Sequence, residues 1–288
     1  MSTRVPVAVV MIALNEAAHM ESVLENVVPW AQEVFLVDSH STDSTVDIAL
    51  KHGVYVIQRK FTGFGDQWNF AMQALPIHAP WTMKLDPDER LTDELKRAID
   101  EAIRTDNADA LSISRRLWFM GRPLPVRQEL LRIWRTGTCK FSDVLVNEQP
   151  LVDGRIQSVR AELEHYDSPD LHHWYEKQNR YTTAEALSSF RGLSLSAEPR
   201  LLGTRLERRM WIKRYFHRLP FVFFSLYLYH YLILGAWKAG RVGHIWAHLR
   251  VEVYRAWVYK LREMQITGHE IVLPPPQEGT PDSRVPQF

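Results

Sequence analysis

The sequence contains a single cysteine, Cys139, among its 288 residues, so no disulfide can form within the chain. A lone thiol is typical of a protein from a reducing compartment. The chain also lacks an excess of charge of either sign, because 35 lysines and arginines stand against 34 aspartates and glutamates. This balance gives no overall indication of nucleic-acid binding. The apolar run near the start is soon interrupted by Asn15 and Glu16, which predicts a first strand rather than a signal peptide.

Two nucleotide-binding motifs are absent as well. The chain has neither GxGxxG nor GxxxxGK[ST], so the main sequence evidence for a dinucleotide-binding fold or a P-loop fold is missing. Hydrophobic residues make up 45% of the sequence, which is enough for a substantial core. The length allows one large domain, or one domain with a sizeable appendage.

Strand and helix patterns alternate in the first third of the chain, which predicts parallel crossovers and an α/β sheet. The expected strands are 5–14, 33–39, 54–59 and 81–89. The expected helices are 15–31, 41–53, 66–75 and 92–105. After Asp106 the segments 110–121, 129–137 and 160–166 are typical of short strands that extend the sheet in a mixed or antiparallel way. A further helix is expected over 172–187.

Acidic residues follow three of the expected parallel strands. Glu16 comes after the first strand, Asp38 after the second, and Asp86 and Asp88 after the fourth. Any one of these acids has a plain alternative as a helix cap or turn residue. Together they indicate a site, because ligands of open parallel sheets bind beyond the carboxyl ends of the strands. The carboxylates of Asp86-Pro87-Asp88 repel one another, and Mg²⁺ or Mn²⁺ would balance them and carry a substrate's phosphates.

Four segments of the first third are distinctive: "VVMIALNEAAHMESVLENV", "FLVDSHSTDSTVDIA", "FTGFGDQWN" and "MKLDPDERL". They resemble family 2 glycosyltransferases with the GT-A fold, in the branch typified by lipopolysaccharide core β-1,4-glucosyltransferases. The resemblance continues through "VNE", "EHY" and "KQNRY" and so covers roughly residues 5–260. The family pattern Asp-Ala-Asp-Glu stands here as Asp86-Pro87-Asp88-Glu89, and its Val-His-Glu stands as Val146-Asn147-Glu148.

The resemblance implies a role for each matching residue. A UDP-sugar would be held at its uracil and ribose by the backbone of Ala13 and Leu14 together with Glu16 and Asp38. The nucleotide pocket would be completed by Arg59, Gln67, Asn69, Lys84, Asp86 and Pro87. Asp88 would bind a divalent cation, Mg²⁺ or Mn²⁺, which assists the departure of the diphosphate.

The resemblance makes Glu148 the candidate general base that accepts the proton of the acceptor hydroxyl. Glu89 and Asp167 are the rival acids, and a solvated loop carboxylate is the plain alternative for Glu148. The departure at Asn147 concerns contacts with the acceptor more than the acid itself. His165 matches the branch's His-Tyr pair and would complete the metal site, although a lone histidine is more often structural.

Further contacts to the diphosphate or the acceptor are expected from two places. Lys177 and Tyr181 are four residues apart on the helix expected over 172–187, where they and Arg180 can clamp the diphosphate. An ordinary charged helix face explains these residues equally well. Arg132 and Arg135 are candidates to contact a phosphorylated acceptor, and Glu89 lies beside the metal motif.

The stretch from Leu219 to Trp237 has no charged side chain and is rich in aromatic residues. It follows the cations Arg205, Arg208, Arg209, Lys213, Arg214 and Arg218 and precedes Lys238 and Arg241. We favour the interpretation that this stretch forms helices lying in the membrane interface. The open alternatives are a transmembrane span and a helical segment that forms an oligomer contact or part of the core. The expected organisation is a GT-A domain over 1–198, a helical region over 199–270, and a loose tail over 271–288.

These observations together predict an enzyme. The expected activity is metal-dependent, inverting transfer of a sugar, glucose in the first instance, from a UDP-sugar to a hydroxyl of a lipid-linked glycan. The alternatives are a polyprenyl-phosphate glycosyltransferase and a non-catalytic nucleotide-binding scaffold. The expected location is the cytoplasmic face of the inner membrane, as a peripheral or monotopic protein, and homo-oligomers are possible partners.

Overall fold

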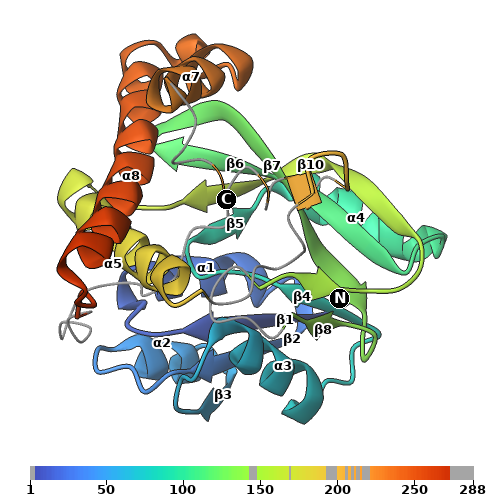
Figure 1. Cartoon of the computed structure of the whole chain (residues 1–288). Helices are drawn as coiled ribbons and strands as arrows, with labels where there is room; N and C mark the ends of the chain where they lie inside the picture. The colour runs from blue at the N-terminus through green and yellow to red at the C-terminus, as the bar shows by residue number, and fades with distance from the viewer. Residues whose placement is uncertain are drawn as a thin grey trace. The chain divides into compact units, whose positions relative to one another are not determined.

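A computed structural model describes residues 4–142, 148–168, 170–192, 200–204, 207–208, 211, 215 and 221–272. The chain forms two compact units, which Figure 1 shows in chain-order colours. Among the described residues, the first, which we name the sheet unit, comprises 4–118 and 127–167. The second, which we name the helical unit, comprises 119–126 and 168–272. The expected boundary between residues 198 and 199 and nearly all of the tail lie outside the described residues, and both stay predictions.

The predicted alternation of strand and helix is confirmed in the first third of the chain. The elements there are β1 (Val5–Ala13), α1 (Ala17–Val27), β2 (Ala31–Asp38), α2 (Thr45–Lys51), β3 (Tyr55–Gln58), α3 (Phe64–Ala74), β4 (Trp81–Lys84), β5 (Glu89–Leu91) and α4 (Asp93–Thr105). Thr92 caps α4, since its hydroxyl accepts a hydrogen bond from the backbone N–H of Leu95 at 3.1 Å. The expected strand 81–89 is divided, because the chain turns at Asp86–Asp88 before β5 begins.

The later strands extend the sheet in the mixed manner that the sequence predicts. They are β6 (Ala110–Phe119), β7 (Arg122–Arg135) and β10 (Ile156–Tyr166), and a separate small sheet pairs β8 (Lys140–Phe141) with β9 (Pro150–Leu151). The large sheet has eight strands in the order β3-β2-β1-β4-β7-β6-β10-β5. Strands β1, β2, β3 and β4 run parallel to one another, whereas β4 is antiparallel to β7 and β5 is antiparallel to β10.

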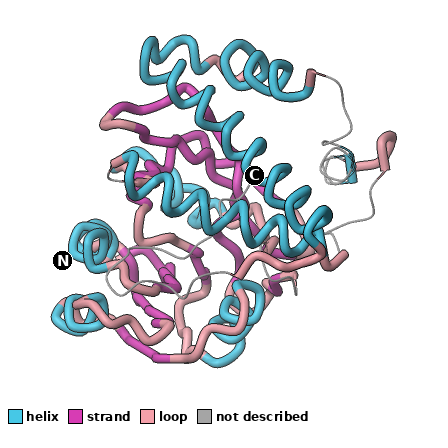
Figure 2. The backbone as a smooth tube through the Cα atoms, turned by 60° about the vertical axis from the view of Figure 1, so that its left-hand side comes forward, coloured by secondary structure: helices cyan, strands magenta, loops and turns pink. Residues whose placement is uncertain are grey.

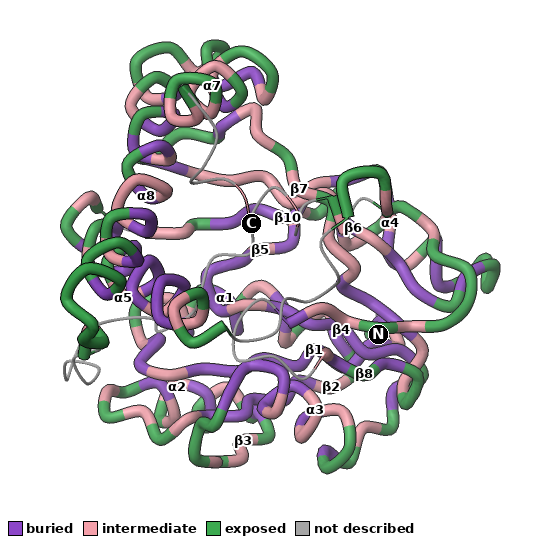
Figure 3. The backbone as a smooth tube through the Cα atoms, in the orientation of Figure 1, coloured by how far each residue is buried: buried purple, intermediate pink, exposed green. Residues whose placement is uncertain are grey.

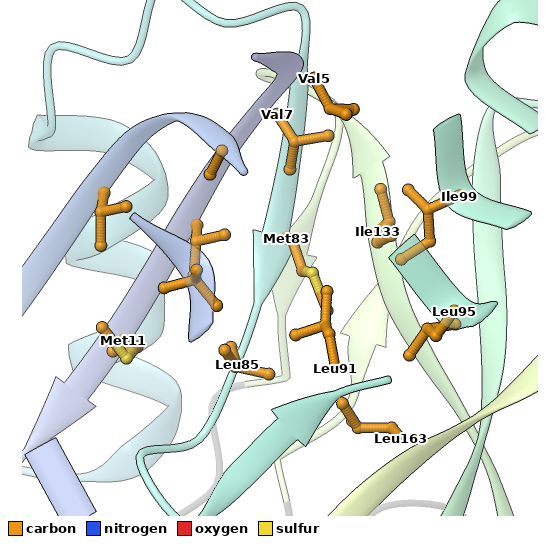
Figure 4. Packing of buried hydrophobic residues seen from close by; sticks show 14 of the residues in the cluster. Val5, Val7, Met11, Met83, Leu85, Leu91, Leu95, Ile99, Ile133 and Leu163 are labelled. Atoms are coloured by element: carbon orange, nitrogen blue, oxygen red, sulfur yellow. The ribbon is translucent and has the colours of Figure 1, made fainter. Parts of the chain in front are cut away.

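The register of the parallel strands brings their carboxyl ends to one edge of the sheet. Ala13 at the end of β1 pairs with Asp38 at the end of β2, and Val10 pairs with Lys84 at the end of β4. We name this edge the acidic rim. It is held in place by a buried cluster that joins the strands to the helices around them, in which Met83, Leu91 and Leu163 pack closely (Figure 4). Burial of these apolar side chains is the main stabilising contribution to the unit.

The helical unit contains the longest helices of the described chain, which Figure 2 shows in cyan. They are α5 (Leu171–Phe190), α7 (Val222–Leu228), the π-helical turn η2 (Tyr229–Ile233), the 3₁₀ turn η3 (Ala236–Ala239) and α8 (Gly240–Thr267). The side chain of Lys260 on α8 donates to the hydroxyl groups of Thr182 and Thr183 on α5, at 2.9 and 2.7 Å. These bonds fix α5 against α8. The helix expected over 172–187 is confirmed.

Candidate active site

Asp38 is the last residue of β2, at the acidic rim, and is fully buried. Its carboxylate accepts hydrogen bonds from the backbone N–H of Ser41 at 2.9 Å and from the side-chain amide of Gln58 at 3.0 Å, as well as from the Ser41 hydroxyl. The backbone N–H of Asn15 donates to Ser41 in turn, at 2.8 Å. The rim therefore has a rigid polar wall, and Ala13, Leu14 and Glu16 lie beside it at the end of β1.

Three further expected nucleotide contacts, Arg59, Gln67 and Asn69, come from the segment after β3, and the first two of them meet near Asp38. Arg59 donates to the side-chain oxygen of Gln67 at 2.8 Å, and Gln67 donates to the hydroxyl of Ser39 at 3.3 Å. Hydrogen bonding from Arg59 lowers the pKa of the Asp66 carboxyl. Asn69 is turned elsewhere, since its amide exchanges two hydrogen bonds with the backbone of Phe141, at 3.0 and 2.8 Å. Asn69 therefore holds β8 in place.

Lys84 and Glu148 form an ion pair at the end of β4, with 2.7 Å between Nζ and Oε1. Both side chains are buried, at 3% and 7% exposure. The ammonium group also lies over the rings of Trp68 and Phe141, 4.6 and 5.3 Å from their centroids. The predicted base is therefore part of a fixed buried pair rather than a solvated loop acid.

Glu89 has a different environment from the other acids of the Asp86–Glu89 turn. It is completely buried, and its carboxylate accepts from Arg132 at 2.5 Å and from Arg115 at 3.3 Å. Its second oxygen accepts from the backbone N–H of Asp86 at 3.0 Å, which closes the turn. Arg132 also reaches the Asp86 carboxylate at 3.2 Å. Two arginines thus balance the charge that the sequence alone left unexplained at Glu89, and this enclosure argues against Glu89 as the general base.

Arg132 is itself fully enclosed, with 1% of its side chain exposed. Burial alone would lower the pKa of its guanidinium, but the neighbouring carboxylates of Glu89 and Asp86 outweigh burial and raise it. By pairing with both Asp86 and Glu89, the buried Arg132 side chain anchors the Asp86–Glu89 turn. The expected contact of Arg132 with a phosphorylated acceptor gains no support from this placement.

Asp88, His165 and Asp167 come together at the end of β10. One ligand atom from each residue lies within 4.8 Å of the other two. His165 Nε2 is 3.3 Å from Asp88 Oδ2 and 4.0 Å from Asp167 Oδ1. The backbone supports this arrangement, because His165 pairs with Glu89 across β10 and β5, and the N–H of Tyr166 donates to the carbonyl of Asp88 at 2.9 Å.

The three residues fit a divalent cation of the Mg²⁺ or Mn²⁺ type. Two carboxylate oxygens and one imidazole nitrogen form a donor set that such ions accept, with Mn²⁺ the more tolerant of nitrogen. Asp88 and His165 were expected as ligands, whereas Asp167 was expected only as a rival base. The available signal was its position two residues after His165, at the end of the same strand.

The remaining predicted residues lie in the helical unit. Lys177, Arg180 and Tyr181 are on α5, where Lys177 and Tyr181 are buried and Arg180 is half-buried. Their expected role at the diphosphate stays a prediction. No helix in the described ranges is long and apolar enough to cross a membrane.

Residues 8–168, more than half of the chain, match the family model described as glycosyl transferase family 2. The protein therefore belongs to this family. It is 25% identical over 232 residues to an uncharacterized glycosyltransferase of Rickettsia prowazekii, covering 74% of this chain and 77% of that protein. It is 26% identical over 198 residues to the lipopolysaccharide core biosynthesis glycosyltransferase LpsC of Rhizobium meliloti, covering 65% of this chain and 72% of that protein.

Solved structures agree on the fold. The mannosyltransferase PcManGT of Pyrobaculum calidifontis, determined in complex with GDP-Man and Mn²⁺, superposes with a TM-score of 0.51. The match covers 91% of this chain and 88% of that chain at 16% sequence identity. The predicted GT-A fold is confirmed.

Proposed function

We propose that this glycosyltransferase transfers a sugar, glucose in the first instance, from a UDP-sugar to a hydroxyl of a lipid-linked glycan, with inversion. The observation that carries the proposal is the grouping of one ligand atom each from Asp88, His165 and Asp167 within 4.8 Å of one another, at the same edge of the sheet as the hydrogen-bonded Asp38. A candidate cation site and a candidate nucleoside site on one sheet edge are what a nucleoside diphosphate requires. The similarity to LpsC supports a glycan of the lipopolysaccharide core as acceptor.

Different rim residues would bind different parts of the UDP-sugar donor. The wall formed by Asp38, Ser41 and Asn15 offers fixed polar groups to the uracil and ribose, with Arg59 and Gln67 beside it. Asp88, His165 and Asp167 would hold Mg²⁺ or Mn²⁺, an assignment that the Mn²⁺ in the PcManGT complex supports. Such an ion stabilises the negative charge of a departing diphosphate.

Glu148 is the proposed general base. Its Oε1 accepts from Lys84, which fixes the orientation of the carboxylate that would take the acceptor's proton. The buried pair with Lys84 gives the Glu148 carboxylate a defined position before the acceptor binds, and general base catalysis depends on such positioning. The lipid-linked acceptor also places the enzyme at a membrane, which we propose is the cytoplasmic face of the inner membrane.

Incubation of the purified protein with a panel of nucleotide sugars and Mn²⁺ tests the proposal. We expect slow donor hydrolysis with UDP-glucose, inhibition by EDTA, and loss of the activity in Asp88→Asn. The anomeric configuration of a transferred sugar, read by NMR, tests inversion. Absence of both turnover and metal-dependent UDP binding would support the non-catalytic scaffold and overturn the proposal.

A further inference from the structure

The helical segment from Phe221 to Trp237 presents large apolar side chains on two faces. One face belongs to the core of the helical unit, where Val222, Phe223 and Leu226 pack against the cluster that includes Trp257 and Leu261 of α8. The other face is exposed and consists of Phe221, Phe224, Tyr229, Leu232, Ile233 and Trp237. We name this second set the α7 apolar face.

The exposure of these side chains is large. Phe221 and Ile233 expose 84% and 74% of their surface, and Figure 3 shows the exposed stretches of α7 in green. Single apolar side chains on a surface need no explanation, but six exposed ones within residues 221–237 mark a candidate interaction site. Apolar side chains thus lie both on the packed face and on the exposed face of this segment, whereas a helix with one face in water ordinarily has polar residues there.

The charged residues that are nearest in sequence to the α7 apolar face all have the same sign. From Phe221 to Val251 the sequence contains no aspartate or glutamate. Lys238 and Arg241 are exposed directly after the face, and Arg250 follows within α8. A partner that covers the face therefore meets positive charge at its border, so the complementary partner is anionic.

The geometry of the segment distinguishes a surface position from a membrane span. The continuous helical run from 222 to 233 is about 18 Å long at the rise of an α-helix, against roughly 30 Å for the hydrocarbon core of a bilayer. It ends at Gly235, whose φ of +76° turns the chain into η3 and α8. Tyr229 and Trp237 on the exposed face are of the types that prefer the headgroup level.

We propose that the α7 apolar face lies in the interface of an anionic phospholipid bilayer, with Lys238 and Arg241 on the lipid phosphates. The apolar side chains enter the boundary between headgroups and acyl chains, parallel to the membrane plane. A second copy of the chain is a poorer occupant. A two-fold contact over this face would bring Lys238 and Arg241 of both copies together with no carboxylate from 221–251 to offset them.

Co-sedimentation of the full chain with vesicles tests this surface. We expect binding to phosphatidylcholine vesicles that contain phosphatidylglycerol, and a loss of affinity of roughly tenfold or more in Leu232→Ser/Ile233→Ser, because each buried CH₂ contributes to partitioning. The matched control is Ile266→Ser, which removes an even more exposed side chain (84%, against 74% for Ile233) near the end of α8 and should bind as the wild type does.

The two kinds of contact can be separated by charge. Lys238→Gln/Arg241→Gln should lose roughly fivefold in affinity per removed charge on vesicles with phosphatidylglycerol and little on pure phosphatidylcholine. High salt should reproduce this loss in the wild type.

Three results would overturn the proposal. The first is no binding of the wild type to anionic vesicles, and the second is equal binding by the Leu232→Ser/Ile233→Ser variant. The third is a wild-type dimer in light scattering that this variant dissociates, without vesicle binding, which would make the face a subunit contact. Hydrolysis of a soluble UDP-sugar should be equal in wild type and variant, so failure of the membrane surface and failure of the proposed activity are distinguishable.

Discussion

Lys84 and Glu148 are 64 positions apart in the sequence, yet their side chains form a buried ion pair with a 2.7 Å contact. A buried charge requires a partner, so each of the two residues fixes the other. If Glu148 is the base, the pair serves stability and catalysis together. The two contributions can be measured separately, because one depends on charge balance and the other on proton transfer.

Glu148→Gln should reduce turnover several hundred-fold, since general base catalysis contributes roughly 10² to 10⁴ in rate. Binding of UDP and metal should be unchanged. The same variant leaves the Lys84 ammonium buried without its counter-charge, and we expect it to lose about 3–5 kcal/mol in the free energy of unfolding. Single-turnover kinetics and urea unfolding measure the two effects.

The double variant Lys84→Met/Glu148→Gln is the control for this experiment. Removing both charges should restore most of the stability and none of the turnover. If restored stability brings back the activity, Glu148 is structural. If Glu148→Gln keeps most of its activity, the acceptor is an already ionised phosphate, as in polyprenyl-phosphate transfer.

Asp88→Asn and His165→Ala should each weaken Mn²⁺ binding in the presence of UDP by at least about tenfold, because each removes one of three ligands. Asp167→Asn should behave in the same way, which distinguishes a metal ligand from a rival base. Electron paramagnetic resonance of Mn²⁺ measures the affinity directly. Asp153→Asn, at an exposed position between β9 and β10, is the matched control and should bind as the wild type does. Unchanged affinity in Asp167→Asn would remove that residue from the site.

Arg132→Met should destabilise the sheet unit by about 3–5 kcal/mol, because it leaves the fully buried Glu89 with only the longer 3.3 Å contact to Arg115. Arg104→Met removes an arginine whose side chain is 75% exposed and whose pair with Asp100 lies on the surface of α4. That control should cost less than about 1 kcal/mol. Urea unfolding of the two variants gives the comparison, and similar costs for both would show that Arg132 does not anchor the turn.

The acidic rim could be predicted from the sequence because its signals are local. Strands β1, β2 and β4 are apolar runs of strand length, and the acids that follow them reach one edge by the rules of parallel crossovers. Asp38 and Asp88 were expected there for this reason. The same reasoning could not divide the acids by function, since Asp86, Asp88 and Glu89 look alike in the chain.

What could not be predicted depends on the pairing of distant strands. The charge of Glu89 is balanced by Arg115 on β6 and Arg132 on β7. No residue near Glu89 in the sequence indicates that it pairs with these two arginines. Asp167 joins the candidate metal site only because β10 pairs with β5 in one register. A shift of one residue would turn His165 to the other face of the sheet. Likewise, the contact between Asn69 and Phe141 requires β8, a strand of two residues that has no sequence signal.

His230 provides a prediction for the helical unit at low pH. Its ring is buried beneath the α7 apolar face, where Nδ1 donates to the carbonyl of Leu226 at 2.8 Å and the ring packs against Trp246. Burial, helped by the nearby charge of Arg250, lowers its pKa from 6.5 to about 4. Between these two values the unfolded chain binds a proton that the folded chain does not. The free energy of unfolding therefore falls as the pH decreases from 6.5 towards 4, by up to about 3 kcal/mol from this one group.

His230→Asn can donate to the same carbonyl but does not titrate, so its stability should be less sensitive to acid in this range. As the pH falls from 6.5 to 4, the free energy of unfolding of the wild type should decrease more than that of His230→Asn. Urea unfolding of both proteins at several pH values measures this difference. His172→Asn, at a position where 86% of the side chain is exposed, should leave the pH profile unchanged. Parallel profiles for wild type and His230→Asn would mean that the His230 ring takes up its proton in the folded protein as readily as in the unfolded chain.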